Sequence, residues 1–495
     1  CARRYLTEGY GCVFKRQGID ASAKKIDKPH ISPIETNRDK TSAFVDSVLA
    51  MPVAEVEPVF VDFSREVQKG TLMGGNELLA HRDVDSRLFH LSFVIERGTK
   101  EDPALDVAEQ YLPYLGTDSM DASQLQSRLY ALACDATLST EAGRTRLTLS
   151  GLAENMEEAL RLTERWIATA RPDTAIYAQV VNDILKLRAD NKTNQKACFN
   201  ALTQYGIYGP HNAITDAMDA ARMRQLGAAG VLQHLRSLCG VAQHVLYYGP
   251  LESTQVSRLV NEVHPMSEHP EAAHDGQFYT PLQVDESRVI IAPFQAKNTY
   301  MMSYSSRGEQ FSLAQQPYVG VFNEYFGGGM NSIVFQELRE SRGLAYNASA
   351  LFSQASRPSD REWFFTRIIT QNDKLKDCLK VFDEIVEQMP QSESAFSLAR
   401  EAVIKRLATQ RILREQILDY YLRCRDQGLD DDPDKAVYEK VKTMTMADLL
   451  SFHEREIAKR KYHLLLLGDE ADWDMSSLQQ RGAIQRVTLK DIFGY

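Results

Sequence analysis

The residues best suited to chemistry lie in one stretch, FGGGMNSIVFQELRESRGLAY, at positions 326–346. Arg339 and Tyr346 are seven residues apart, and three consecutive glycines precede them: Gly327, Gly328 and Gly329. A guanidinium and a phenol are both donors suited to an anionic or developing oxyanionic oxygen. Because glycine-rich entries to helices often bind phosphate, the first question is whether this stretch is a nucleotide site.

Nucleotide-binding motifs do not fit this stretch. A P-loop requires G-x-x-x-x-G-K-[ST], and no lysine follows the glycines. The dinucleotide fingerprint G-x-G-x-x-G directly follows a strand, whereas position 332 is Ser332 and the preceding PYVGVFNEYF predicts a helix. Three residues without Cβ do let a backbone turn tightly or approach another backbone closely.

The elements around Arg339 and Tyr346 predict that both side chains project to one side of a cavity mouth. Val334 and Leu338, one turn apart, are expected to anchor a helix face, and Gly343 suits the end of that helix. Arg339 then lies on the last helical turn, and Tyr346 begins the next strand. From the residues alone, the alternative is that Arg339 pairs with a surface carboxylate and Tyr346 is a half-buried strand aromatic.

No complete metal or catalytic motif is visible in the chain. The segment His264-Pro-Met-Ser-Glu268-His269 is one residue too long for the zinc motif H-x-x-E-H. Five helical residues turn the second imidazole about 140° from the first, and the flanking prolines favour a solvated linker. A G-x-S-x-G nucleophile elbow is absent, and the seven scattered cysteines favour free thiols over a disulfide framework.

Composition predicts a globular protein with more than one core. The chain has 495 residues, of which 43% are apolar and 25% charged. A net charge of −10 and a pI of about 5.7, with no basic run, argue against nucleic acid and anionic membranes as partners. No apolar stretch approaches the roughly 18–20 residues that span a bilayer, so we expect no membrane span.

The order of predicted elements repeats, which indicates two tandem homologous α+β domains, each an antiparallel or mixed sheet packed with helices. Three pairs of landmarks recur at a nearly constant offset: Arg97-Gly98 with Arg307-Gly308, Tyr114-Leu-Gly116 with Tyr325-Phe-Gly327, and Gly249 with Gly468.

The domain boundaries follow from this repeat. We predict a first domain over residues 59–262, a linker over 263–287 and a second domain over 288–495. The proline-bearing, charged segment 18–58 predicts an extended linker. Residues 1–17 are interpreted as the last strand of an upstream domain.

The stretch at 326–346 resembles the glycine-rich and L-R-E-x-x-G-L-A-Y segment of pitrilysin/insulinase-type zinc metallopeptidases, the inverzincins, which include mitochondrial processing peptidase and insulin-degrading enzyme. Strands ending in Arg-Gly, a helix ending in Gly116-Thr117 and the tandem repeat extend the resemblance over residues 59–495. The opening YLTEGYGCVFKRQG with its linker is similar to the junction between halves in long bacterial members.

The resemblance implies a clamshell of two halves, one of which holds Zn²⁺ through H-x-x-E-H and a downstream Glu. The corresponding positions here are Val107-Ala-Glu-Gln110-Tyr111, which carry no imidazole, and Asp183 near the third ligand position cannot bind zinc alone. The chain therefore resembles the non-zinc half, with no metal ligands of its own. This half is expected to supply Arg339 and Tyr346 to a cavity shared with an N-terminal zinc-binding partner half.

Further expectations come from the same resemblance. Gly327, Gly328 and Gly329 would lie near the substrate cavity, so they either contact a peptide substrate or serve as a purely structural helix entry. The long bacterial members imply a bacterial periplasm or cell envelope. The alternatives are a non-catalytic structural relative, like the core subunits of the cytochrome bc1 complex, and a peptide-binding scaffold whose partner has also lost zinc.

Overall fold

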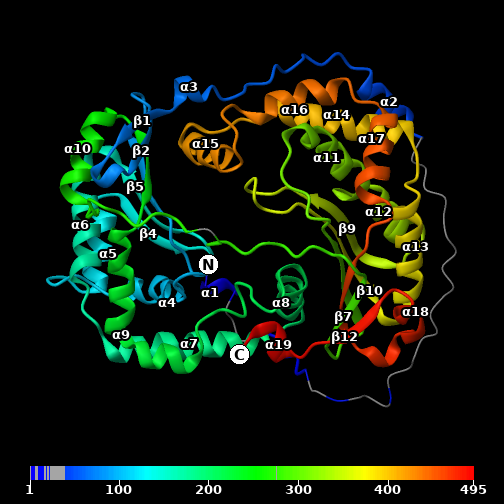
Figure 1. Cartoon of the computed structure of the whole chain (residues 1–495), viewed down its shortest axis with the longest axis horizontal. Helices are drawn as coiled ribbons and strands as arrows, with labels where there is room; N and C mark the ends of the chain where they lie inside the picture. Colours follow the sequence, from blue (N-terminus) through cyan, green and yellow to red (C-terminus); the bar gives the residue numbers. More distant parts are fainter. Residues whose placement is uncertain (1, 6–8, 16–17, 19–21, 23–39, 275) are drawn as a thin grey trace.

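A computed structural model describes residues 2–5, 9–15, 18, 22, 40–274 and 276–495 (Figure 1). Two domains lie side by side, the first coloured blue to green and the second green through yellow to red. No helix among the described residues is long and apolar enough to cross a membrane.

The first domain contains a six-stranded sheet and the helices that cover it. Its elements are α3 (Phe63–Glu66), β1 (Gln68–Thr71), β2 (Glu77–Arg82), β3 (Leu88–Ile95), α4 (Ala104–Tyr111), α5 (Ala122–Ala131), β4 (Cys134–Thr140), β5 (Thr145–Leu152), α6 (Met156–Thr169), α7 (Thr174–Asn191), α8 (Gln195–Tyr208), α9 (Ala220–Ser237), β6 (Gln243–Gly249) and α10 (Ser253–Val263).

The second domain repeats this plan. Its elements are β7 (Arg288–Pro293), β8 (Asn298–Ser305), α11 (Gln316–Phe322), α12 (Ile333–Phe335), β9 (Ala345–Ser353), β10 (Trp363–Gln371), α13 (Leu375–Glu387), α14 (Glu393–Thr409), α15 (Ile417–Asp426), α16 (Pro433–Lys442), α17 (Met446–Phe452), β11 (His463–Gly468), α18 (Met475–Gln479), β12 (Ala483–Arg486) and α19 (Leu489–Phe493).

Sheet topology confirms the predicted α+β class and the repeat. The strand orders are β1-β2-β6-β3-β5-β4 and β12-β7-β11-β8-β10-β9. The last long strand of each domain, β6 in the first sheet and β11 in the second, lies inside its sheet. Each runs parallel to one neighbour and antiparallel to the other, so both sheets are mixed. Both closing strands, β6 and β11, end in the predicted landmark glycines, Gly249 and Gly468. The sheets differ at one edge, where β1 is antiparallel to β2 but β12 is parallel to β7.

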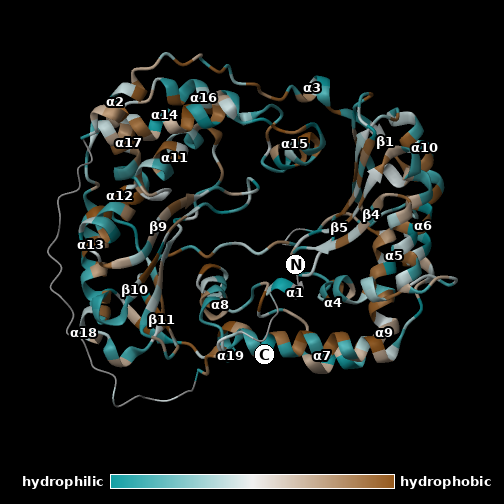
Figure 2. Ribbon diagram, turned by 180° about the vertical axis from the view of Figure 1, so that it is seen from behind, coloured by the Kyte–Doolittle hydropathy of each residue, from teal (hydrophilic) through white to brown (hydrophobic). Residues whose placement is uncertain are grey.

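Helices cover one face of each sheet and bury the main apolar clusters there. The outer helices alternate polar and apolar residues in Figure 2, as expected for helices with one buried side. The other face of each sheet is covered by a helix from the opposite domain. α15 packs on β2 and β6, and α8 packs on β8 and β11 (Figure 1).

The segment before the first domain differs from its prediction. Residues 2–5 form helix α1 and residues 9–15 form no strand, while 1, 6–8 and 16–17 lie outside the described residues. A strand requires a neighbour for its backbone N–H and C=O groups, and no strand of the described residues pairs with this segment. That it completes an upstream sheet stays a prediction.

The two predicted linkers are described in part. Residues 19–21 and 23–39 lie outside the described residues, and α2 (Ala43–Leu49) interrupts the extended segment predicted for 18–58. Ser42 caps this helix by accepting a hydrogen bond from Val45 N, and no proline occurs between residues 34 and 51 to prevent it. Apart from residue 275, which is not described, residues 264–287 between α10 and β7 form no helix or named strand.

Candidate active site

The helix that carries Arg339 is anchored by the predicted residues. Val334 and Leu338 are fully buried in the second core. After α12 the helix widens to π-type hydrogen bonding over Gln336–Ser341, a local insertion that often occurs at functional sites. Gly343, with φ of +57°, ends it, and its N–H donates to Arg339 O at 3.1 Å.

Arg339 and Tyr346 lie together at the surface. The Arg339 Cζ is 5.9 Å from the centre of the Tyr346 ring and 4.8 Å from that of Phe335. Tyr346 is 78% exposed on β9, so it is not the half-buried strand aromatic of the alternative interpretation. The Arg339 guanidinium lies beside the carboxylate of Glu340, with Nε and Oε1 3.5 Å apart. Both donors therefore face solvent from adjacent elements.

The three glycines have different surroundings. A Cβ on Gly327 would lie 2.3–2.6 Å from the backbone of Ala350, and one on Gly328 would lie 2.7 Å from Asn323 O. These two residues let the segment pack against β9 and the preceding helix, so they have a structural role. Gly329 is exposed, and a Cβ there would meet nothing within 4 Å. Contact with a peptide remains a prediction.

Helix α4 of the first domain, where the resemblance places the zinc motif, does not fit a zinc ion. Val107 and Tyr111 are fully buried in the core, and the Tyr111 hydroxyl donates to Asp173 O at 2.9 Å. Gln110 Nε2 donates to Asp106, and Asp183 is exposed on α7, where it accepts a hydrogen bond from Gln179. Among the described residues, no group of three His, Cys, Asp or Glu side chains could hold a metal ion.

The segment from His264 to His269 is not entirely the solvated linker that its prolines predicted. His264 is buried at the end of α10, and its Nδ1 lies 2.7 Å from Glu164 Oε1. Its Nε2 lies 3.1 Å from Gln243 Oε1, and its ring stacks on Phe93. These contacts make His264 a structural core residue, which its sequence spacing did not reveal.

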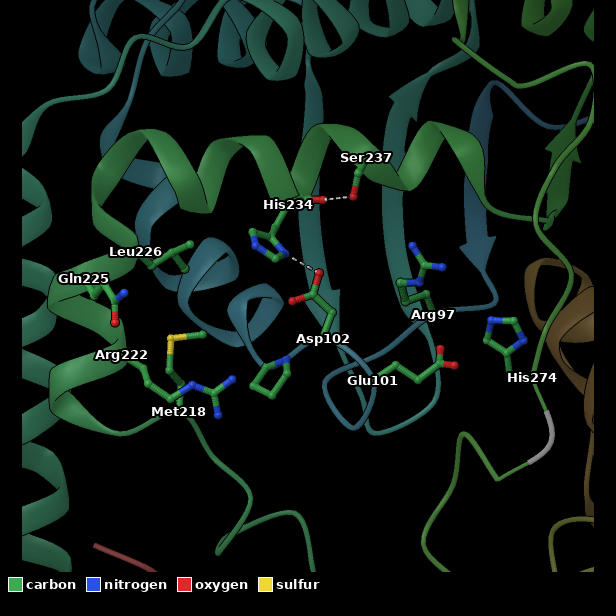
Figure 3. Close-up of a pocket in the computed structure, with 11 residues that line it drawn as sticks. Arg97, Glu101, Asp102, Met218, Arg222, Gln225, Leu226, His234, Ser237 and His274 are labelled. Atoms are coloured by element: carbon green, nitrogen blue, oxygen red, sulfur yellow. Dashed lines mark hydrogen bonds and ion pairs between the residues drawn. The ribbon is translucent and has the colours of Figure 1, made fainter.

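A cavity of about 870 Å³ lies in the first domain between the loop after β3 and helix α9 (Figure 3). His234 extends from α9 toward Asp102, and its Nδ1 is 2.7 Å from Asp102 Oδ2. The cavity contains none of the predicted site residues. Asp102 and His234 are too far apart in the chain for any spacing motif to have paired them.

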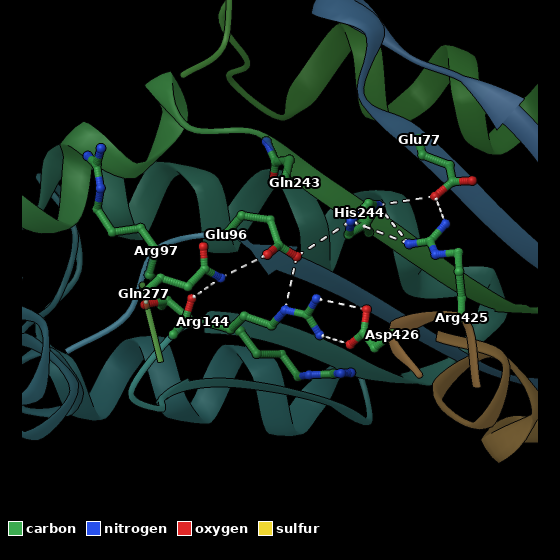
Figure 4. Close-up of polar contacts among 12 residues, drawn as sticks. Glu77, Glu96, Arg97, Arg144, Gln243, His244, Gln277, Arg425 and Asp426 are labelled. Carbon is green, nitrogen blue, oxygen red and sulfur yellow. Dashed lines mark hydrogen bonds and ion pairs between the residues drawn. The ribbon is translucent and has the colours of Figure 1, made fainter. Parts of the chain in front are cut away.

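A network of charged side chains joins the two domains where α15 meets the first sheet (Figure 4). Arg144 Nε is 2.9 Å from Glu96 Oε1, and both its terminal nitrogens donate to Asp426 on α15. His244 lies between Glu96 and Glu77, which also accepts from Arg425 of α15.

The charges of this network compensate one another. The hydrogen bond from His244, together with Arg425, lowers the pKa of Glu77 to about 2 against its partial burial. Burial alone would raise the pKa of Glu96, but His244 and Arg144 outweigh it and lower that pKa to about 2. Glu77 and Glu96 are therefore ionised at neutral pH.

The fold is that of M16-like peptidases. The M16 inactive domain from Pseudomonas fluorescens is 17% identical, with a TM-score of 0.66 over 81% of this chain and 98% of that one. The periplasmic protease PqqL from Escherichia coli is 15% identical, with a TM-score of 0.62 over 90% of this chain. The ferredoxin protease FusC, whose structure is a complex with Arabidopsis ferredoxin, is 10% identical, with a TM-score of 0.67 over 90% of this chain.

The family model described as "Peptidase M16 inactive domain" matches residues 243–403, which include the glycines, Arg339 and Tyr346. No curated protein sequence matches the chain. The chain spans 49% of PqqL and 48% of FusC, about half of each. The resemblance seen in the sequence is thus confirmed: this chain is similar to the C-terminal, non-zinc half of an M16 peptidase.

Proposed function

We propose that this chain is the non-zinc half of a zinc-dependent peptidase and that it closes a chamber over peptide substrates. An N-terminal half, on the same or a separate polypeptide, holds Zn²⁺ and the general base. Arg339 and Tyr346 contribute to the shared active site. The long bacterial relatives favour a periplasmic or envelope location, and PqqL is itself described as periplasmic.

The observation that carries this proposal is the exposed Arg339–Tyr346 pair. The two groups come from adjacent elements, lie within 5.9 Å of one another and leave their donors directed to solvent. Stacking on Phe335 limits the rotamers of Arg339, so its guanidinium is held ready without a strong ion pair.

The pair suits the charge that develops during peptide hydrolysis. Zinc held by the partner half would supply an activated water, and the oxygen of the attacked peptide carbonyl would then gain negative charge. The Arg339 guanidinium and the Tyr346 hydroxyl donate hydrogen bonds to that oxygen or to the neighbouring peptide backbone. Since α4 of this chain carries none of the imidazoles of the zinc motif, we assign this chain substrate binding and charge stabilisation.

The test is peptide cleavage by this chain assembled with its zinc-binding half. We expect Arg339→Ala and Tyr346→Phe each to reduce the rate about 100–1,000-fold, the usual cost of removing one such donor. Arg342→Ala is a matched control, because Arg342 lies three residues away but pairs with Glu337 and Glu384. It should leave the rate within about threefold.

Three results would contradict the proposal. If Arg339→Ala and Tyr346→Phe leave the rate within about twofold, these residues are not part of the active site. If the assembled protein binds peptides without cleaving them, the chain is instead a peptide-binding or structural relative. If the isolated chain binds stoichiometric zinc and cleaves peptides, it is not a non-zinc half.

A further inference from the structure

A groove of about 580 Å³ lies between the glycine segment and α14, beside the helix that carries Arg339. Leu398, which is 56% exposed, forms part of one wall, and three alanines of α14 complete it: Ala395, Ala399 and Ala402. The opposite wall includes Glu324, Asn331 and Gln336. Small side chains on one wall and an exposed leucine beside them leave an apolar surface open to a ligand.

The charged groups of this groove are predominantly acidic. Glu324 is exposed and has no ion-pair or hydrogen-bond partner in the described part of the chain. Glu401 pairs with Lys405, one helical turn away, at 3.4 Å. Such an exposed pair contributes at most about 1 kcal/mol, so a ligand cation can compete for Glu401.

The groove adjoins the helix that carries Arg339, because Gln336 of that helix lines it. Gln336 lies one helical turn before Arg339, and its Nε2 donates to Met330 O at 2.6 Å, which fixes the end of the glycine segment. Met330 is 72% exposed and Gly329 has open space around it, so the end of the glycine segment next to the groove is accessible to solvent. A peptide crossing the pair can therefore place a side chain between the glycine segment and α14.

We infer that this groove is a subsite for the side chain of a lysine or arginine in the bound peptide. This inference rests on the proposed function and adds a substrate preference to it. The aliphatic stem of the side chain lies along Leu398 and the alanines, while its charged end reaches Glu324 and Glu401. Lysine and arginine are the residues that combine a long apolar stem with a positive charge.

The test compares fluorescent, unstructured peptides that are identical except for one central residue: lysine, norleucine or glutamate. Their binding to the full 495-residue chain is measured by fluorescence anisotropy. We expect the lysine peptide to bind about fivefold more tightly than the norleucine peptide and more tightly still than the glutamate peptide. Glu324→Gln combined with Glu401→Gln should remove this preference, and Lys405→Met should strengthen it about twofold.

Glu268→Gln is the matched control, because Glu268 is exposed in the interdomain linker and its loss changes the net charge in the same direction. This variant should keep the preference for lysine. A photo-crosslinker placed beside the central lysine should label α14 near Leu398. Equal binding of the three peptides, a preference that survives the double substitution, or no binding of any peptide would overturn the subsite.

The subsite and the proposed function fail in different ways. Loss of the lysine preference with an undiminished effect of Arg339→Ala on cleavage contradicts the subsite alone. A lysine preference that maps to the groove, together with no effect of Arg339→Ala on cleavage, contradicts the role of the pair alone.

Discussion

An arginine occupies the same place in both domains but has different neighbours. The pairing of β4 with β5 and of β9 with β10 aligns Cys134 with Ala345, and Arg128 on α5 and Arg339 each lie six residues before these positions. Tyr346 lies at the register shift of β9 and has no aligned counterpart in β4. Arg128 forms an ion pair with Glu158, whereas Arg339 stacks on two aromatic rings. The same backbone position thus serves surface pairing in the first domain and, as we propose, catalysis in the second.

The first domain lacks accessible polar groups at another position, the helix where the family resemblance places the zinc motif. On α4 of the first domain, Val107 and Tyr111 are directed into the core and pack there. In the second domain, the glycines after α11 allow a close approach to β9 and leave an exposed surface. One domain has apolar contacts at the positions of the zinc motif, and the other keeps polar groups accessible. Four experiments test the different roles that we assign to residues of the two domains.

The largest effect is expected at the charged end of the first sheet. Arg144→Met leaves Glu96 and Asp426 without their shared cation, and breaking such a largely buried network costs about 3 kcal/mol. Chemical denaturation followed by tryptophan fluorescence should show a lower unfolding midpoint and weaker coupling between the domains. Arg128→Ala, which removes an exposed pair, should change the stability by less than about 0.5 kcal/mol. Equal losses in both variants would show that the network does not join the domains.

The glycine segment provides the second test. Gly327→Ala forces a Cβ against the backbone of Ala350 and should lower the free energy of unfolding by roughly 2 kcal/mol. Gly329→Ala has open space around it and should leave the stability within about 0.5 kcal/mol. Thermal unfolding of the two variants measures the difference. A stable Gly327→Ala variant would remove the structural role assigned to this glycine.

The same substitution at two tyrosines gives the third test. Tyr111→Phe removes a hydroxyl that hydrogen-bonds both the N–H and the C=O of Asp173, so stability should fall by about 1–2 kcal/mol. Tyr346→Phe should leave stability unchanged, because its ring is 78% exposed, while cleavage by the assembled protein falls. A loss of stability in the Tyr346→Phe variant would show that the Tyr346 hydroxyl has a structural role.

The smallest expected effect is a difference in how stability depends on pH, and it comes from two carboxyl groups at the same end of the two sheets. Burial raises the pKa of Glu362 to about 7, whereas Glu96 has a pKa of about 2. Because the folded pKa of Glu362 exceeds its ordinary value of 4.5, its contribution to stability is present below pH 4.5 and is lost as the pH rises to 7. Glu96, with its lowered pKa, stabilises the fold above pH 4.5 and loses that contribution as the pH falls toward 2.

Unfolding midpoints measured between about pH 5 and 8 test this contrast. Glu362→Gln should lose less stability than the unsubstituted chain as the pH rises, since the glutamine does not ionise. Glu96→Gln should differ most from the unsubstituted chain at neutral pH. Parallel pH profiles for Glu362→Gln and the unsubstituted chain would contradict the raised pKa of Glu362.

Features that depend on local patterns were predictable from the sequence. Val334, Leu338 and Gly343 are spaced as a helix face and a helix end require, and the landmark glycines revealed the repeat. Residues 2–5 and 9–15 form no strand, because a strand depends on a neighbour that the local sequence does not supply, so the interpretation of residues 1–17 as the last strand of an upstream domain stays a prediction.

Contacts between distant residues were not predictable from one sequence. The stacking of Phe335 on Arg339 follows from helical spacing and could have been proposed, but the π-type turn that aims Arg339 could not. The network around Arg144 and Asp426 joins residues from different domains, and neither residue lies in a recognisable motif. Contacts of this kind between residues far apart in the sequence can be identified only from the three-dimensional structure.

The exchange of α8 and α15 has a consequence for synthesis of the protein. The first sheet is complete once β6 is made, yet the apolar side chains of Leu79, Val94 and Leu246 are covered only when α15 arrives from the second domain. At about 5–20 residues per second, a ribosome needs on the order of ten seconds to make the intervening chain. During that interval one apolar face of the first sheet is exposed in the nascent chain. We therefore expect chaperones to bind the nascent chain mainly between the completion of β6 and the emergence of α15.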